Sequence, residues 1–143
     1  MMSSKYAGYT GKVMLVDLSS ETVQEYPWSD RERQLYLGGK IMANKILCDL
    51  LSGSEQAFSE ENRIVITTGP LTLSGSPSSS RYDMAAISPA SGLPAVSNCG
   101  GDFGMYLKRA GYEPIEADCG MMALEQIARN PDIGVAILDI MVP

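Results

Sequence analysis

The stretch that most constrains this chain is residues 69–104, GPLTLSGSPSSSRYDMAAISPASGLPAVSNCGGDFG. It is rich in glycine, serine and proline, and it carries one basic residue, Arg81, followed by the turn sequence Asn98-Cys99-Gly100-Gly101. Small residues leave the backbone uncovered, so a ligand can approach the main chain closely. A guanidinium adds a permanent positive charge, and free N–H groups at the start of a helix favour anions. The stretch therefore indicates a site for a phosphorylated or otherwise anionic ligand, with a plain surface loop as the alternative that the residues alone leave open.

Composition limits the classes of function. The chain has 143 residues, 45% of them hydrophobic and 20% charged, which suits one modest globular domain with a core. Its net charge of −6 argues against a general nucleic-acid binder or a membrane-surface binder, and no apolar run is long enough to span a bilayer. Histidine is absent, so the commonest general base is missing and any chemistry needs a bound cofactor or another part of the protein.

The three cysteines, Cys48, Cys99 and Cys119, are odd in number and widely spaced. This pattern does not suit a disulfide framework, and it predicts a reducing, cytoplasmic environment. Cys99 has no base or second ligand nearby in the sequence, so we interpret it as a small buried or half-buried thiol.

Hydrophobic patterning predicts an α+β fold. Alternating or β-branched segments predict strands at 12–18, 22–26, 63–68 and 81–87. Ser29 and Glu32 have the spacing of a capping box, which predicts a short helix that ends at Gly38-Gly39. The apolar stripe of residues 40–51 predicts a second helix, packed into the core.

The second half of the chain changes in character. After a proline-rich loop, Asn98 is expected to cap a helix that runs to Ala110 and closes at Gly111. Beyond it, the pattern predicts a short strand at 114–118, a helix at 120–130 and a buried strand at 133–140. This β-α-β order contrasts with the meandering strands before it.

Residues 8–112 resemble the N-terminal domain of the aldehyde ferredoxin oxidoreductases, the tungsten-pterin enzymes. Five pieces carry the resemblance in the family's order: GYTGKVMLVDLSS, YLGGK, SEENRIVITTGPLT, SRYDMAAISPASG and SNCGGDFGMYLKRAGY. They lie within about three quarters of the chain, and they make a specific match. The implied fold is an antiparallel-rich sheet with helices, which forms a base for a bis-pterin tungsten cofactor.

The resemblance also implies roles for four residues. Arg81 would contact the pterin phosphate region, and the backbone carbonyl of Asn98 would face a magnesium ion that bridges the two pterin phosphates. Gly100 and Gly101 would let the chain lie against the pterin. Arg81 and the turn that begins at Asn98 are accordingly expected to lie side by side in space.

The resemblance implies an activity for a complete protein rather than for this chain alone. In the family an aldehyde is oxidised to its acid at tungsten, or at molybdenum, and electrons pass through a 4Fe-4S cluster to ferredoxin. The cysteines for that cluster are expected in further domains, which would be the partners of this part, and a homodimer stays open. We therefore expect no catalytic residue here and no activity from this chain by itself. Three departures from the family pattern stand out: Ser78-Ser79-Ser80 before the arginine, Cys99 in place of serine, and Lys40-Ile41 in place of Arg-Gly.

A second resemblance begins near Lys108 and covers residues 108–143. The sequence from Ala110 onward, AGYEPIEADCGMMALEQIARNPDIGVAILDIMVP, is similar to part of a response-regulator receiver domain. Asp139 matches the phosphate-accepting aspartate of that family. Two incomplete domains are thus expected, an oxidoreductase part at 1–110 and a receiver-like fragment at 111–143. Two alternatives to the oxidoreductase function stay open at this point: a signalling fragment that uses Asp139, and a truncated or chimeric product with no independent activity.

Overall fold

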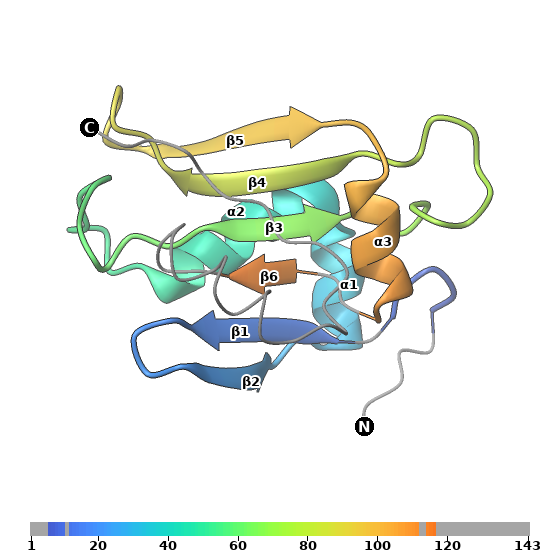
Figure 1. Ribbon diagram of the computed structural model, residues 1–143, viewed down its shortest axis with the longest axis horizontal. Coiled ribbons are helices and arrows are strands. Elements are labelled where there is room, and N and C mark those ends of the chain that lie inside the picture. The colour runs from blue at the N-terminus through green and yellow to red at the C-terminus, as the bar shows by residue number, and fades with distance from the viewer. Residues whose placement is uncertain (1–5, 11, 112–113, 117–143) are drawn as a thin grey trace.

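The computed structural model describes residues 6–10, 12–111 and 114–116. In chain order the elements are β1 (Val13–Asp17), β2 (Thr22–Tyr26), α1 (Asp30–Tyr36), α2 (Gly39–Leu50), β3 (Val65–Thr68), β4 (Tyr82–Ile87), β5 (Pro94–Cys99), α3 (Phe103–Arg109) and β6 (Pro114–Glu116). β1 and β2 form an antiparallel hairpin, and the other strands form an antiparallel sheet in the order β5-β4-β3-β6. β1 lies beside β6, so the hairpin continues the row of strands (Figure 1). The predicted α+β class is confirmed.

Local sequence signals account for the first elements. The turn between β1 and β2 is held by Asp17, whose Oδ1 accepts hydrogen bonds from the backbone N–H groups of Ser19 (2.9 Å) and Ser20 (3.1 Å). The capping box at the start of α1 is present, because Ser29 Oγ accepts from the Glu32 N–H and the Glu32 carboxylate accepts from the Ser29 N–H. The hairpin and the first helix therefore follow from the turn and cap residues that the sequence contains.

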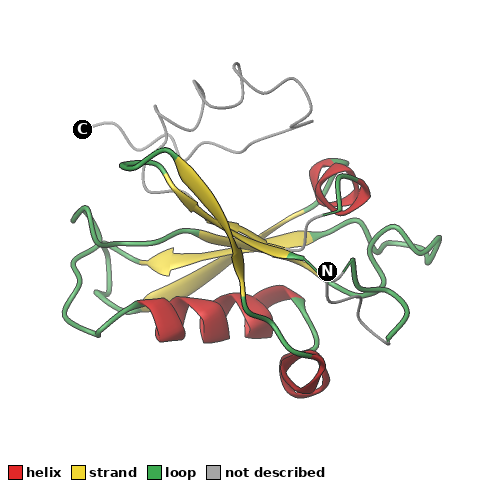
Figure 2. Cartoon of the chain, turned by 90° about the horizontal axis from the view of Figure 1, so that it is seen from below, coloured by secondary structure: helices red, strands yellow, loops and turns green. Residues whose placement is uncertain are grey.

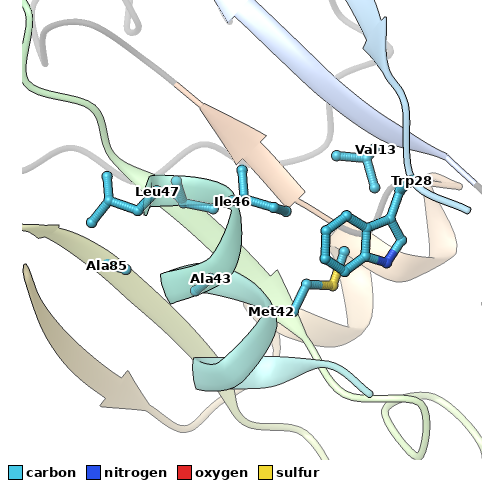
Figure 3. Packing of buried hydrophobic residues seen from close by; sticks show 8 residues of the cluster. Val13, Trp28, Met42, Ala43, Ile46, Leu47 and Ala85 are labelled. Atoms are coloured by element: carbon cyan, nitrogen blue, oxygen red, sulfur yellow. The ribbon is translucent and has the colours of Figure 1, made fainter. Parts of the chain in front are cut away.

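The core lies between α2 and the sheet (Figure 3). α2 turns its apolar stripe toward the strands, as its spacing predicts, and the buried residues of this cluster are Val13, Trp28, Met42, Ala43, Ile46, Leu47, Val65 and Ala85. Leu47 and Ala43 have no exposed surface at all. At about 25 cal/mol for each Å² of apolar surface removed from water, burial of this cluster is the main force that holds α2 on the sheet.

A smaller cluster covers the opposite face. Ile66 and Tyr82 of the sheet pack there against Leu107 and Phe103 of α3. The rings of Tyr82 and Phe103 meet edge to face, with 4.8 Å between their centroids. Figure 2 shows α2 along one side of the sheet and α3 on the other. The sheet is therefore a layer between two helices of unequal length.

The predicted start of the third helix is wrong. Residues 94–99 form β5, which pairs along the whole of β4 from Tyr82↔Cys99 to Ile87↔Pro94, so Asn98 lies in a strand and caps no helix. α3 begins instead at Phe103, with Asp102 as its N-cap residue. The reason is tertiary: β4 offers β5 a full ladder of backbone hydrogen bonds, and the chain turns into a helix only after the glycine pair. The predicted end of the helix is confirmed, since Gly111 follows the C-cap at a φ of +91° and donates its N–H to Lys108 O.

The strand predicted at 114–118 is present within the described residues as β6, which pairs antiparallel with β3. Pro114–Glu116 thus extends the sheet built by the first part of the chain. The helix predicted at 120–130, the strand at 133–140 and Asp139 lie outside the described residues. The division into domains at residue 110 stays a prediction.

Candidate functional site

Arg81 and Asn98 meet at one end of the β4–β5 hairpin. In the ladder, Tyr82 pairs with Cys99 and Asp83 pairs with Asn98, so Arg81 and Gly100 follow at the same end of the two strands. Arg81 Nη1 donates a hydrogen bond to Asn98 Oδ1. At this end the chain leaves β5 and turns into α3 (Figure 1). The structure therefore brings together the arginine and the turn that the sequence singles out.

The charge of Arg81 is exposed and lies ready for an external anion. A guanidinium has five N–H donors, and a forked, planar group of this kind matches a phosphate or a carboxylate. Within residues 6–10, 12–111 and 114–116, Arg81 makes no ion pair, and its hydrogen bond to Asn98 occupies one donor. Its other donors can therefore serve a ligand.

The glycine pair beside Arg81 leaves open space. A Cβ atom added at Gly100 or at Gly101 would meet no atom of the chain within 4 Å. Gly101 has a φ of +101°, a conformation that other residues rarely adopt, whereas the backbone at Gly100 does not require glycine. Gly100 is thus a glycine that neither packing nor the local backbone explains, as expected for a surface that something else approaches.

The backbone just before Arg81 is fixed by α3. A Cβ atom at Gly104 would come within 2.8 Å of Ser80 O, so the first turn of α3 lies directly on the chain that enters β4. Lys108, on the same helix, is buried and donates from Nζ to the carbonyls of Gly69 and Pro70, both at 2.9 Å. α3 therefore holds both ends of the loop 69–80, which contains Ser78-Ser79-Ser80.

Asp83 is a site residue that the sequence analysis missed. Asn98 Nδ2 donates hydrogen bonds to Asp83 Oδ1 at 2.9 Å and to Tyr82 O at 3.2 Å. The strand period of two was the signal that could have found it, since Arg81 and Asp83 stand on the same face of the strand. The other carboxylate oxygen lies at the start of α2, because a Cβ atom at Gly39 would come within 2.8 Å of Asp83 Oδ2.

Tyr82 of β4 and Cys99 of β5 are paired at the same end of the hairpin, on the face opposite Arg81 and Asp83. Burial and a hydrogen bond with Cys99 raise the pKa of Tyr82 to about 12, so this phenol stays neutral at physiological pH. Tyr82 is therefore not a proton-transfer group at neutral pH. Cys99 itself is exposed, so the interpretation of a buried or half-buried thiol is wrong.

Three other kinds of site are relevant: a metal centre, a surface depression and a membrane-spanning helix. In the described part of the chain, no group of three or more His, Cys, Asp or Glu residues is arranged to hold a metal ion. A depression of about 450 Å³ lies over β4 and β5, and neither Arg81, Asn98, Gly100 nor Gly101 lines it. No helix among the described residues is long and apolar enough to cross a membrane.

Comparisons with known proteins agree with the first resemblance. The family model for the aldehyde ferredoxin oxidoreductase N-terminal domain matches residues 13–118. The tungsten-containing aldehyde ferredoxin oxidoreductase of Pyrococcus horikoshii is 35% identical over 108 residues, which are 76% of this chain and 18% of that enzyme. The aliphatic sulfonate oxidoreductase, WOR-like subunit, of Pyrococcus furiosus is 33% identical over 110 residues, 75% of this chain and 17% of that protein.

A solved structure shows the same fold. The active site complex BamBC of benzoyl coenzyme A reductase, in complex with 1,5-dienoyl-CoA, matches with a TM-score of 0.73 and 33% identity over 77% of this chain and 17% of that one. The chain spans about a fifth of the length of these relatives. None of these matches supports the receiver-type resemblance of residues 108–143. The matched range, the identities and the shared fold show that this chain belongs to the aldehyde ferredoxin oxidoreductase family, within its N-terminal domain.

Proposed function

We propose that this chain is the cofactor-seating part of a tungsten- or molybdenum-pterin aldehyde:ferredoxin oxidoreductase. The observation that carries the proposal is the exposed Arg81, held by Asn98 beside the open space at Gly100 and Gly101. A permanent cation next to uncovered backbone suits a phosphate group.

The chemistry of these residues and the open space at Gly100 and Gly101 support the proposed cofactor. Arg81 would donate to a pterin phosphate, and the Asn98 backbone carbonyl would be a hard oxygen ligand for a magnesium ion bound with the cofactor. Gly100 and Gly101 would give the pterin room against the main chain. The bound metal would supply the two-electron oxidation of the aldehyde. This chain would orient the cofactor and fix its position relative to the other domains of the enzyme.

The proposal places the remaining steps elsewhere in the protein. Further oxidoreductase domains would be the direct partners of this part and would hold the 4Fe-4S cluster that passes electrons to ferredoxin. Relatives named for an aldehyde, a sulfonate and a coenzyme A ester each match about three quarters of this chain. A shared cofactor seat explains this better than a substrate pocket does, because seating the cofactor does not depend on the substrate.

Titration of the 143-residue chain with inorganic pyrophosphate and Mg²⁺, followed by calorimetry, tests the phosphate site. We expect Arg81→Ala to weaken binding by at least about tenfold, which is about 1.4 kcal/mol and the least expected for a hydrogen bond to a charged group. Arg109→Ala is the matched control, since Arg109 is another exposed arginine, at the end of α3. Equal affinity of Arg81→Ala and the unmodified chain would refute the assignment.

Gly100→Ala provides a second variant for the same titration. The added methyl group meets no protein atom, so the free energy of unfolding should change by less than about 0.5 kcal/mol. If the ligand lies against the glycine pair, the methyl group will nevertheless lower affinity. Unchanged affinity would exclude Gly100 from the contact surface.

A further inference from the structure

We propose that Asp83 is a positioning residue, which fixes the side-chain amide of Asn98 so that Arg81 is held in place for its anionic ligand. The inference rests on the function proposed above, and it adds a residue for which neither the sequence analysis nor the family resemblance gave a role. It follows from a chain of contacts that runs from α2 through Asp83 and Asn98 to Arg81.

The contacts decide which way the Asn98 amide points. Its nitrogen faces two acceptors, Asp83 Oδ1 at 2.9 Å and Tyr82 O at 3.2 Å, while its oxygen accepts from Arg81 Nη1. The reversed orientation would turn the amide nitrogen toward a guanidinium and the amide oxygen toward a carboxylate, so donor would face donor and acceptor would face acceptor. Without the carboxylate, only the Tyr82 carbonyl would hold the amide nitrogen.

The carboxylate itself lies against the first turn of α2. Asp83 is partly buried within β4, and its Oδ2 lies at the first turn of α2, where only a glycine at position 39 leaves room for it. Gly39 has a φ of +59°, and its carbonyl accepts a hydrogen bond from Thr67 Oγ1 at 2.8 Å, which ties this turn to β3. α2 in turn is held by the main core. The contact chain therefore connects a solvent-exposed arginine to α2, a helix packed in the main core, as a second layer of support does for a binding group.

The arrangement also keeps the arginine available. Asp83 reaches Arg81 through Asn98 and forms no direct ion pair with it among the described residues. A direct carboxylate partner would compete with an anionic ligand for the guanidinium. A neutral amide between them orients the cation and does not neutralise it.

Two substitutions in the 143-residue chain separate positioning from a general structural role. Asp83→Asn keeps the shape and an acceptor oxygen for Asn98 Nδ2, whereas Asp83→Ala removes that oxygen. The first readout is the pair of side-chain NH₂ signals of Asn98 in ¹H–¹⁵N spectra, identified by their loss in Asn98→Ser. We expect Asp83→Ala to shift them toward the values of a solvent-exposed amide and Asp83→Asn to keep them close to those of the unmodified chain.

The second readout is affinity for inorganic pyrophosphate with Mg²⁺. We expect about a tenfold loss for Asp83→Ala and a change within about threefold for Asp83→Asn. Asp102→Ala is the control, because Asp102 lies in the adjoining turn and its side chain makes no cap hydrogen bond. Thermal unfolding of each variant checks that the chain stays folded.

The outcomes are distinct. Unchanged Asn98 signals and affinity in Asp83→Ala would overturn the inference, and so would an equal loss of affinity in Asp83→Asn and Asp83→Ala. A chain that binds no pyrophosphate at all would overturn the proposed function, and the Asn98 signals would then decide the positioning role by themselves.

Discussion

At the scale of single residues, Arg81 combines two properties that favour ligand binding. Its side chain is exposed, yet it is oriented by a hydrogen bond to Asn98, whose amide is fixed from the other side by Asp83. An exposed arginine usually loses side-chain entropy when it binds a ligand, because its rotamers are free before binding. Here the hydrogen bond to Asn98 already restricts the Arg81 side chain in the free chain, so less side-chain entropy is lost when an anion binds.

Tyr82 gives a prediction of its own at this scale. Its pKa in the folded chain is raised from 10.0 to about 12 by burial and by its hydrogen bond with Cys99. The folded state therefore holds the phenolic proton more tightly than the unfolded state does, so this contribution to stability is complete below pH 10 and is lost between about pH 10 and pH 12. We expect the free energy of unfolding to fall by about 1–3 kcal/mol more over this range in the unmodified chain than in Tyr82→Phe.

Urea unfolding at a series of pH values measures this difference. Tyr106→Phe is the control, because Tyr106 is a half-exposed tyrosine on α3. A Tyr82→Phe variant with the same loss of stability above pH 10 as the unmodified chain would show that Tyr82 does not titrate as described.

At the scale of elements, β5 is the unexpected feature. Its sequence, PAVSNC, contains a proline and polar residues, and all but Val96 of its side chains are exposed, so no buried face identifies it as a strand. Its formation depends on the free edge of β4 and on the turn 88–93, where Ser88 and Leu93 close the hairpin through a 2.9 Å bond from Ser88 N to Leu93 O. The β-propensity of residues 94–99 by themselves does not reveal this strand, because it forms through backbone pairing with another segment, β4.

α1 leads to a prediction at the scale of elements. This helix has only seven residues and depends on its capping box, in which Glu32 N donates to Ser29 Oγ and Ser29 N donates to Glu32 Oε2 at 2.7 Å. Ser29→Ala should lower the free energy of unfolding by about 1 kcal/mol, because the N-terminal N–H of Glu32 loses its acceptor. Urea unfolding measures the change, with Ser97→Ala as the control, since Ser97 is exposed in β5. Equal stability of the two variants would contradict a stabilising role for the cap.

At the scale of the whole molecule, the core between α2 and the sheet supports the site. The same helix that buries Met42, Ile46 and Leu47 begins at Gly39, next to the Asp83 carboxylate. Loss of core packing is therefore expected to loosen the contact chain that ends at Arg81. Stability and ligand affinity should be coupled in this molecule through α2.

Leu47→Ala tests how much this core contributes to stability. Leu47 is fully buried, so its truncation should lower the free energy of unfolding by about 2–5 kcal/mol through lost burial and a residual cavity. Leu35→Ala is the matched control, because Leu35 is 61% exposed in α1 and should change stability by less than about 0.5 kcal/mol. Denaturant unfolding of both variants checks the result. Similar losses would mean that the core does not lie where α2 meets the sheet.

Much of the fold follows from the sequence by itself. The β1–β2 hairpin, the capped helix α1 and the apolar stripe of α2 depend on turn residues, cap residues and periodicity, which act over a few neighbours in the chain. The local sequence also predicts Arg81 and the glycine pair as site residues, because a single basic residue among small residues can be recognised without knowledge of tertiary contacts.

Only the tertiary structure decided that Asn98 belongs to a strand and that Asp83 belongs to the site. Both facts depend on the register of β5 against β4 and on the approach of α2 to the end of that hairpin, and these join residues far apart in the sequence. The physical reason is that strand pairing and side-chain contact satisfy polar groups across such distances, whereas cap and propensity signals report only on the adjoining residues.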